Sequence, residues 1–245
     1  MKNIYILLFL SICFSANGQL RIGAKGGISI PNLEGHREQS KGYASEQAAY
    51  GGLFLNFQLT HLISLQPEIN FSSQGGQRNG LQPIPLDAIS GISLPPGMNL
   101  YANFRNATIL NYLEIPVLVK FAIGHKLKYY ACFGPHIGFL VEAKNKTSGN
   151  SSLYLDATGT ISLKLNENSL PPVSFNNTTD INESIKTVNA GAQGGLGLQY
   201  PVGCGSVFFE GRAVVGITDI QTHPEADGKN QTGSLVMAVG YLIKL

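Results

Sequence analysis

The chain has 245 residues, of which 13% are charged and 43% are hydrophobic, and its formal net charge is +2 at pH 7. A charge this close to neutral gives no indication of nucleic acid or another polyanion as a partner. Beyond the first residues, no stretch of the sequence approaches the roughly 18 apolar residues that a membrane-spanning helix requires. Any residence in a membrane would therefore have to come from β-strands.

The first residues predict export. A lysine is followed by the apolar run IYILLFLSICF and then by the small and polar residues SANGQ. The run is too short to span a bilayer, and Ala16 and Gly18 supply the small side chains that precede a cleavage site. We expect residues 1–18 to be a cleaved signal peptide and residues 19–245 to form the mature domain. Lipoprotein processing at Cys13 is the alternative, which the bulky residue before it disfavours.

Behind the signal, segments with a two-residue hydrophobic period recur along the chain. In residues 62–71, LISLQPEINF, polar side chains alternate with apolar ones over most of the length. This alternation predicts a β-strand that lies between two different environments. Strands are expected at 20–30, 48–59, 62–73, 109–122, 127–142, 187–200, 206–218 and 234–245.

The connections between these eight strands alternate in length. Those at 60–61, 124–126 and 202–205 are short, whereas the connections between them are long. Tight turns on one rim and long loops on the other are typical of outer-membrane barrels. The pattern predicts an all-β fold, namely an eight-stranded antiparallel up-and-down transmembrane β-barrel with long extracellular loops and short periplasmic turns.

Nearly every charge within a predicted strand lies on the polar face, which would line the lumen. Eight strands leave an interior just wide enough for side chains or for one small ligand. Because an unpaired buried charge is costly, charges of both signs should pair there. We expect a structural network of salt bridges, and the alternative is a selective or gated pore lined by the same residues. These residues are Arg21, Lys25, Glu68, Glu114, Lys120, Glu210, Arg212 and Lys244.

Cysteine and histidine residues offer few further sites. Cys132, in strand 127–142, and Cys204, in a short turn, lie near the same rim, so an oxidising periplasm could bridge them if the geometry permits. Two unpaired cysteines are the alternative. His136 and Glu142 share the inward face of strand 127–142 with Cys132. The histidines are scattered and match no zinc motif, so we predict no metal, no cofactor and no catalytic residues.

Four pieces of the sequence resemble a known family. They are GAKGGISIPNL after the signal, LQPEINFSSQGG, LNYLEIPVLVKF and the closing GYLIKL. They are similar to the small outer-membrane β-barrel family that includes the PorT-like proteins, and the resemblance spans essentially the whole mature chain. It implies an eight-stranded barrel in the outer membrane of a Gram-negative cell. That family's pattern contains no catalytic residues, so none can be assigned by resemblance.

The expected role is structural, binding or envelope-transport and secretion support, and the chain is predicted not to be an enzyme. Expected partners are outer-membrane lipid and an extracellular ligand or envelope protein that contacts the loops at 74–108 and 143–186, with no nucleic acid. Residues 152–165, SLYLDATGTISLKL, alternate like a hairpin that extends the barrel wall. The barrel is expected to be a monomer. A small selective pore, a lipid-modifying outer-membrane enzyme and a soluble lipocalin-like carrier are the alternatives.

Overall fold

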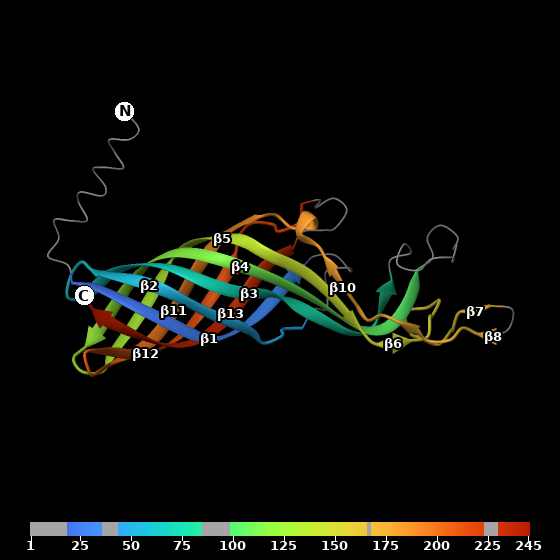
Figure 1. The fold of residues 1–245 in the computed structure, drawn as a ribbon, viewed down its shortest axis with the longest axis horizontal. Coiled ribbons are helices and arrows are strands. Elements are labelled where there is room, and N and C mark those ends of the chain that lie inside the picture. Colours follow the sequence, from blue (N-terminus) through green and yellow to red (C-terminus); the bar gives the residue numbers. More distant parts are fainter. Residues whose placement is uncertain (1–18, 36–43, 85–98, 166–167, 223–229) are drawn as a thin grey trace, which may run out of the picture.

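The computed structural model describes residues 19–35, 44–84, 99–165, 168–222 and 230–245. Eight long antiparallel strands form a closed barrel (Figure 1), in which each strand pairs with its neighbours in the chain. The last strand returns to the first, from Arg21 opposite Lys244 to Gly35 opposite Asn230, and so closes the ring. The strands are β1 (Leu20–Gly35), β2 (Ala48–Gln58), β3 (Ile63–Ile84), β4 (Leu100–Gly124), β5 (Lys128–Ser148), β11 (Val188–Val202), β12 (Gly205–Gly216) and β13 (Asn230–Lys244).

The closed ring confirms the predicted eight-stranded barrel. The short connections lie at one rim, together with the C-terminus and the start of β1 (Figure 1). None of the described helices is long and apolar enough to cross a membrane.

Three strands are much longer than predicted. β3 continues to Ile84, β4 already begins at Leu100, and β5 continues to Ser148, so these strands leave the barrel as a sheet (Figure 1). The strand β10 (Asn177–Asp180) joins this sheet by pairing with the outer part of β5. Much of what the sequence indicated as loop at 74–108 is therefore a paired extension of the wall. We call β10 and the parts of β3, β4 and β5 beyond Gln74, Leu110 and Ala143 the extension.

The distal part of the extension contains shorter elements and its own apolar cluster. The short strands are β6 (Asn150–Ser151), β7 (Lys164–Leu165), β8 (Asn168–Ser169) and β9 (Val173–Ser174). A 3-10 helix (Asn182–Ser184) lies nearer the barrel, beside its mouth. Residues 153–163 form the expected hairpin, which turns at Asp156 and bridges to β4 through Tyr101 and Tyr154. Hydrogen bonds, chiefly from the Thr158 hydroxyl, hold the pKa of Asp156 well below its usual range. The cluster comprises Ile84, Leu100, Ala102, Phe104 and Leu153, with Phe175 stacked on Phe104 at 4.6 Å.

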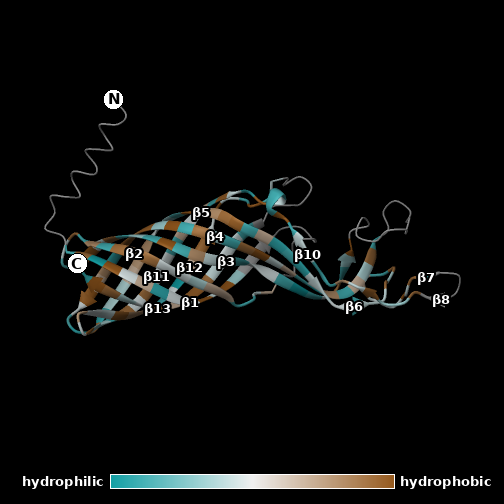
Figure 2. Cartoon of the chain, viewed as in Figure 1, coloured by the Kyte–Doolittle hydropathy of each residue, from teal (hydrophilic) through white to brown (hydrophobic). Residues whose placement is uncertain are grey.

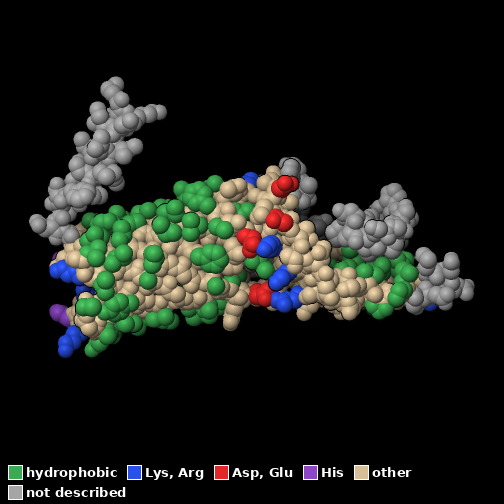
Figure 3. Space-filling view, viewed as in Figure 1, with side chains coloured by type: hydrophobic (Ala, Val, Ile, Leu, Met, Phe, Trp, Pro, Cys, Tyr) green, Lys and Arg blue, Asp and Glu red, His purple; other side chains and the backbone are tan. Residues whose placement is uncertain are grey.

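The outer surface of the barrel is apolar, and its interior is largely polar. Hydrophobic and hydrophilic residues alternate along every strand (Figure 2), and apolar side chains cover the visible outer wall (Figure 3). Phe133, Leu196 and Ile217 are 66%, 71% and 65% exposed, whereas inward residues such as Cys132, Gln193 and Val214 are at most 3% exposed. An exposed apolar band of this kind suits lipid and not water. The distribution therefore argues against the soluble lipocalin-like alternative.

One irregularity reverses the facing of a strand near the extracellular rim. Between Asn111 and Tyr112 the pairing of β4 with β5 shifts, so that Asn111 faces Glu142 while Tyr112 faces Leu140. A β-bulge of this kind adds one residue and changes which side chains point inward. The prediction that Glu142 lies in the lumen is therefore wrong. Its carboxylate lies on the outer face and pairs with Lys144 at 2.5 Å.

Small residues inside the barrel make room for large rings. A Cβ atom at Gly197 would lie 2.3 Å from the ring of Tyr130, because this inward ring lies against the bare backbone of β11. At Gly211, on the lipid-facing side of the adjacent strand, a Cβ atom would meet nothing within 4 Å. The two glycines thus have different reasons to be present.

We predict that Gly197→Ala destabilises the barrel by about 1 to 3 kcal/mol, because the added methyl group displaces the Tyr130 ring. Gly211→Ala, the matched control, should leave the unfolding free energy nearly unchanged. Urea unfolding of both variants in lipid vesicles measures the difference. Equal effects of the two substitutions would contradict the inward packing of Tyr130 against β11.

Candidate functional site

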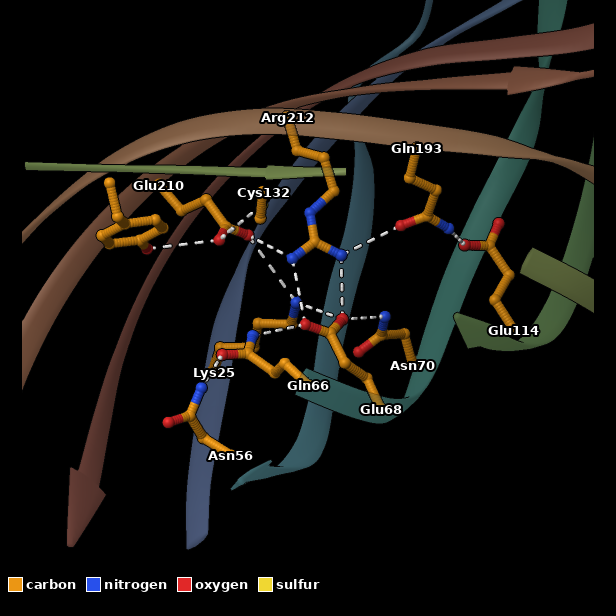
Figure 4. A network of polar contacts seen from close by, with 11 residues as sticks. Lys25, Asn56, Gln66, Glu68, Asn70, Glu114, Cys132, Gln193, Glu210 and Arg212 are labelled. Carbon is orange, nitrogen blue, oxygen red and sulfur yellow. Dashed lines mark hydrogen bonds and ion pairs between the residues drawn. The ribbon is translucent and has the colours of Figure 1, made fainter. Parts of the chain in front are cut away.

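The carboxylate of Glu68 is the centre of a buried polar network in the lumen (Figure 4). Arg212 donates two parallel hydrogen bonds to it, from Nη1 to Oε2 at 2.8 Å and from Nη2 to Oε1 at 3.0 Å. The Lys25 ammonium donates to Oε2 at 2.7 Å, and the amides of Gln66 and Asn70 donate at 2.7 and 2.8 Å. Bidentate and charge-assisted bonds are the strong kind, so this carboxylate is held from all sides.

A second carboxylate, that of Glu210, shares the same cations. Its Oε1 lies 2.6 Å from Nη2 of Arg212 and 3.7 Å from the Lys25 ammonium. The other oxygen accepts a hydrogen bond from the Tyr130 hydroxyl at 3.2 Å and contacts the Cys132 thiol at 3.7 Å. Two acids and two bases therefore neutralise one another where their side chains are at most 2% exposed.

Glu114 is joined to this network through a neutral side chain. Its carboxylate accepts hydrogen bonds from Gln74 at 2.5 Å and from Gln193 at 2.8 Å. Gln193 in turn accepts a hydrogen bond from Arg212 at 2.9 Å. Among the described residues no cation lies within ion-pair distance of Glu114, so the expectation of a direct salt bridge there is corrected. Amide groups satisfy this carboxyl group, because a buried carboxyl group needs hydrogen-bond donors and not necessarily a full positive charge.

Lys120 is the third buried cation, and aromatic rings surround it. Its ammonium lies 3.5 Å from the centroid of the Tyr130 ring and 5.8 Å from that of Phe208. Cation–π attraction of this kind is strongest where water is excluded. The lumen thus encloses three bases and three acids, and its formal charge is balanced. They are Lys25, Lys120 and Arg212 with Glu68, Glu114 and Glu210.

Apolar layers lie above and below this polar centre. Towards the short turns the layer comprises Phe54, Leu118, Tyr130, Cys132, Phe208 and Leu242. Towards the extension, Ile185 and Ile220 reach over the mouth from the segments that follow the 3-10 helix and β12. They pack on barrel residues Leu110, Tyr112 and Ala143. The buried charges therefore lie in a compartment with an apolar layer at each end.

Two residues expected in the network lie elsewhere. Arg21 and Lys244 face each other across β1 and β13 at the rim of the short turns. The Arg21 guanidinium donates to the Gln58 side chain at 2.9 Å, and Lys244 is exposed. Both residues occupy the inward positions of the two-residue alternation, as predicted. They lie on the rim side of the apolar layer, however, and so cannot reach the buried carboxylates.

The two cysteines are not bridged, so of the two alternatives the structure has the unpaired cysteines and not the disulfide. Cys132 is buried in the lumen, whereas Cys204 is exposed in the turn between β11 and β12, next to the Tyr241 hydroxyl at 3.8 Å. Cys132 pairs with Gly195, which is seven residues from the end of β11. At about 3.3 Å per residue this separation is roughly 20 Å. A disulfide needs Cα atoms less than about 7 Å apart.

His136 is buried on the inward face of β5, between Pro116 and Gly191 of the flanking strands. Within the described ranges, no group of three or more His, Cys, Asp or Glu side chains is placed to hold a metal ion. The neutral members of the lumen network were not predicted from the sequence; they are Gln66, Asn70, Gln74, Tyr130 and Gln193. The one sequence feature that indicated them was their position on the inward face in the two-residue alternation.

A second feature lies outside the barrel, where the apolar band ends. Acidic and basic side chains gather at the junction with the extension (Figure 3), among them the ion pairs Arg105–Glu46 and Lys144–Glu142. Beside them is an open groove of about 620 Å³. It is lined by Glu46, Arg105, Ala107, Ile109, Lys146, Thr147, Ser148, Asn176, Asn177 and Thr178.

Comparison with known families agrees with this architecture. Residues 14–221 match the family described as outer membrane protein beta-barrel domain, which covers most of the chain. The chain belongs to this family. No curated protein matches the sequence.

Several solved structures are similar to this barrel at low sequence identity. Neisserial surface protein A is 10% identical, with 92% of this chain and 97% of that chain covered and a TM-score of 0.43. Ail, the attachment invasion locus protein of Yersinia pestis, in complex with the heparin analogue sucrose octasulfate, is 12% identical, with 92% and 99% covered and a TM-score of 0.37. Because these identities and TM-scores are low, the barrel is described from its own strand pairing.

The prediction that the chain is not an enzyme is contradicted, because a structure similar to this barrel is an enzyme. Similar structures include the outer membrane protease OmpT of Escherichia coli, at 10% identity over 94% of this chain and 98% of that chain, with a TM-score of 0.34. A barrel of this kind therefore does not exclude catalysis, since function resides in sites and not in folds. So distant a similarity also transfers no protease activity to this chain.

We predict that Glu68→Gln destabilises the barrel by about 3 to 5 kcal/mol, because it leaves Lys25 and Arg212 buried with only one neighbouring carboxylate. Glu142→Gln, which breaks an ion pair on the outer face, should cost at most about 1 kcal/mol. Unfolding by urea in lipid vesicles measures both, and the gel mobility of unheated samples reports folding. A loss at Glu142 as large as that at Glu68 would contradict the assigned network.

Proposed function

We propose that this protein binds a ligand or an envelope partner through its extension, while its balanced lumen has a structural role. The proposal is carried by the apolar cluster in the extension, where Leu100, Ala102 and Leu153 are at most 2% exposed. A plain connecting loop needs no core of its own. A sheet with a packed core can hold side chains in fixed positions for recognition, which suits a binding function.

The groove beside the extension indicates a ligand class. Its polar lining offers amide, hydroxyl and ammonium groups from Asn177, Thr178, Ser148 and Lys146. Arg105 is paired with Glu46, whereas Lys146 has no ion-pair partner among the described residues. Many hydrogen-bonding groups, one free cation and a small apolar floor fit a hydroxyl-rich ligand such as a saccharide.

The position of the protein in the cell follows from the same features. Residence in the outer membrane is supported by the family match and by the apolar outer wall, with lipid as the surrounding partner. We propose cleavage of the signal after residue 18 and a monomeric barrel, since closure of the ring leaves no free barrel edge. The resemblance to PorT-like proteins supports a role in envelope transport or secretion as a second candidate. A pore is less well supported, because apolar layers lie at both ends of the polar centre.

Trimming the extension tests the binding proposal. Gly75 faces Ile109 and Lys144 faces Asp180 across paired strands, so the parts beyond these pairs, which contain most of the groove lining, can be removed with short glycine turns. We predict that the full protein in detergent binds a subset of immobilised saccharides on a glycan array, and that the trimmed protein and Lys146→Ala lose that binding. The trimmed barrel should still fold, as judged by its faster migration before heating.

The control for this experiment is Lys126→Ala, which removes one exposed lysine at the opposite rim. It should leave the array profile unchanged. An empty array, or binding that the trimmed barrel retains in full, would contradict the proposal.

A further inference from the structure

The rim of the short turns has an unbalanced charge. Residues 19–23, 56–65, 120–132, 197–208 and 241–245, which form this end of the barrel, contain no Asp or Glu. Basic side chains appear at this end in Figure 3. They include Arg21, His61, His125, Lys126, Lys128 and Lys244.

These side chains surround a hollow at the mouth of the barrel. A pocket of about 210 Å³ is lined by Arg21, His125, Lys126, Lys128 and Lys244, with Leu242 of the apolar layer below them. Because Arg21 faces Lys244 and Lys128 faces Gln199 across paired strands, polar groups from four strands meet here. All four are on the inward face, so they open along the barrel axis and not into the surrounding lipid.

The basic groups in this hollow lack counter-charges. Among the described residues, the side-chain acceptors of Arg21 are the neutral side chains of Gln19 and Gln58. In the part of the chain that the structure describes, Lys126, Lys128 and Lys244 have no ion-pair partner. Repulsion between neighbouring cations costs free energy, which a bound anion would reverse. In the lumen three acids balance three bases, whereas this rim has basic side chains and no Asp or Glu.

We propose that this mouth is a binding site for a soluble, multiply charged oxyanion, a phosphate or carboxylate compound that enters from the periplasmic side. Arg and Lys donors suit such groups, and the volume accommodates one compact anion. The apolar layer beneath the pocket prevents the anion from moving further, so the site binds and does not conduct. The site lies at the opposite rim from the extension, so this proposal does not depend on the proposed saccharide binding.

Calorimetry of the full protein in neutral phosphatidylcholine nanodiscs, with inorganic pyrophosphate as the probe, tests this site. We expect saturable binding that high salt weakens, and a loss of about tenfold or more in affinity for the double variant Arg21→Gln, Lys128→Gln. The matched control Lys144→Gln, Lys164→Gln removes two charges beyond the other rim, outside the groove lining, and should bind as the unmodified protein does. Lys126→Gln, Lys244→Gln, in which both substituted side chains are exposed, repeats the test if the first variant does not fold.

Three results would overturn the proposal. The first is the absence of saturable binding, and the second is equal weakening at both rims, which would mean that only total charge matters. The third comes from nanodiscs that contain phosphatidylglycerol. If that lipid displaces pyrophosphate, the occupant is a lipid headgroup and the soluble source is wrong.

Discussion

Charges enclosed in an eight-stranded lumen can be neutralised only by other side chains of the same barrel, and this requirement organises the interior of this protein. The bidentate contact between Glu68 of β3 and Arg212 of β12 joins residues 144 positions apart in the sequence. Lys25 of β1 adds a third strand to the same carboxylate. Because removing one member leaves a buried charge with too few partners, the network ties strands together across the lumen as well as around the ring.

The same alternation that places charges inside places apolar side chains outside, so interior and exterior are two results of one sequence pattern. On leaving the apolar band, the wall continues as a sheet that no longer needs lipid on one side. Its buried face is then provided by its own cluster around Leu100 and Phe104. The chain thus contains a closed lumen, a lipid-facing wall and two polar ends. The ends differ in charge: one has ion pairs of acidic and basic side chains, and the other has basic side chains but no Asp or Glu.

Alternation was enough to predict the eight strands, the three short turns and the six buried charges, because one-sided burial fixes the facing of each residue. It did not predict the length of β3, where Gly75 and Gly80 have φ of 130° and 119° and interrupt the period. It placed Glu142 inside because a bulge leaves no clear signal in sequence. Nor could it decide between a disulfide and two free cysteines, since closeness to a rim does not specify register. Contacts between distant strands, such as those of Gln193, depend on the closed ring and cannot be read from a single strand.

A lumen that its own side chains close should not conduct ions. Current measurements on purified protein in planar lipid bilayers at moderate salt test this most directly. We expect no stable single-channel steps from the unmodified protein, and a small leak when Glu114, Lys120, Glu210 and Arg212 are all replaced by alanine. Steady, ion-selective conductance from the unmodified protein would contradict the account and would favour a pore lined by the same residues.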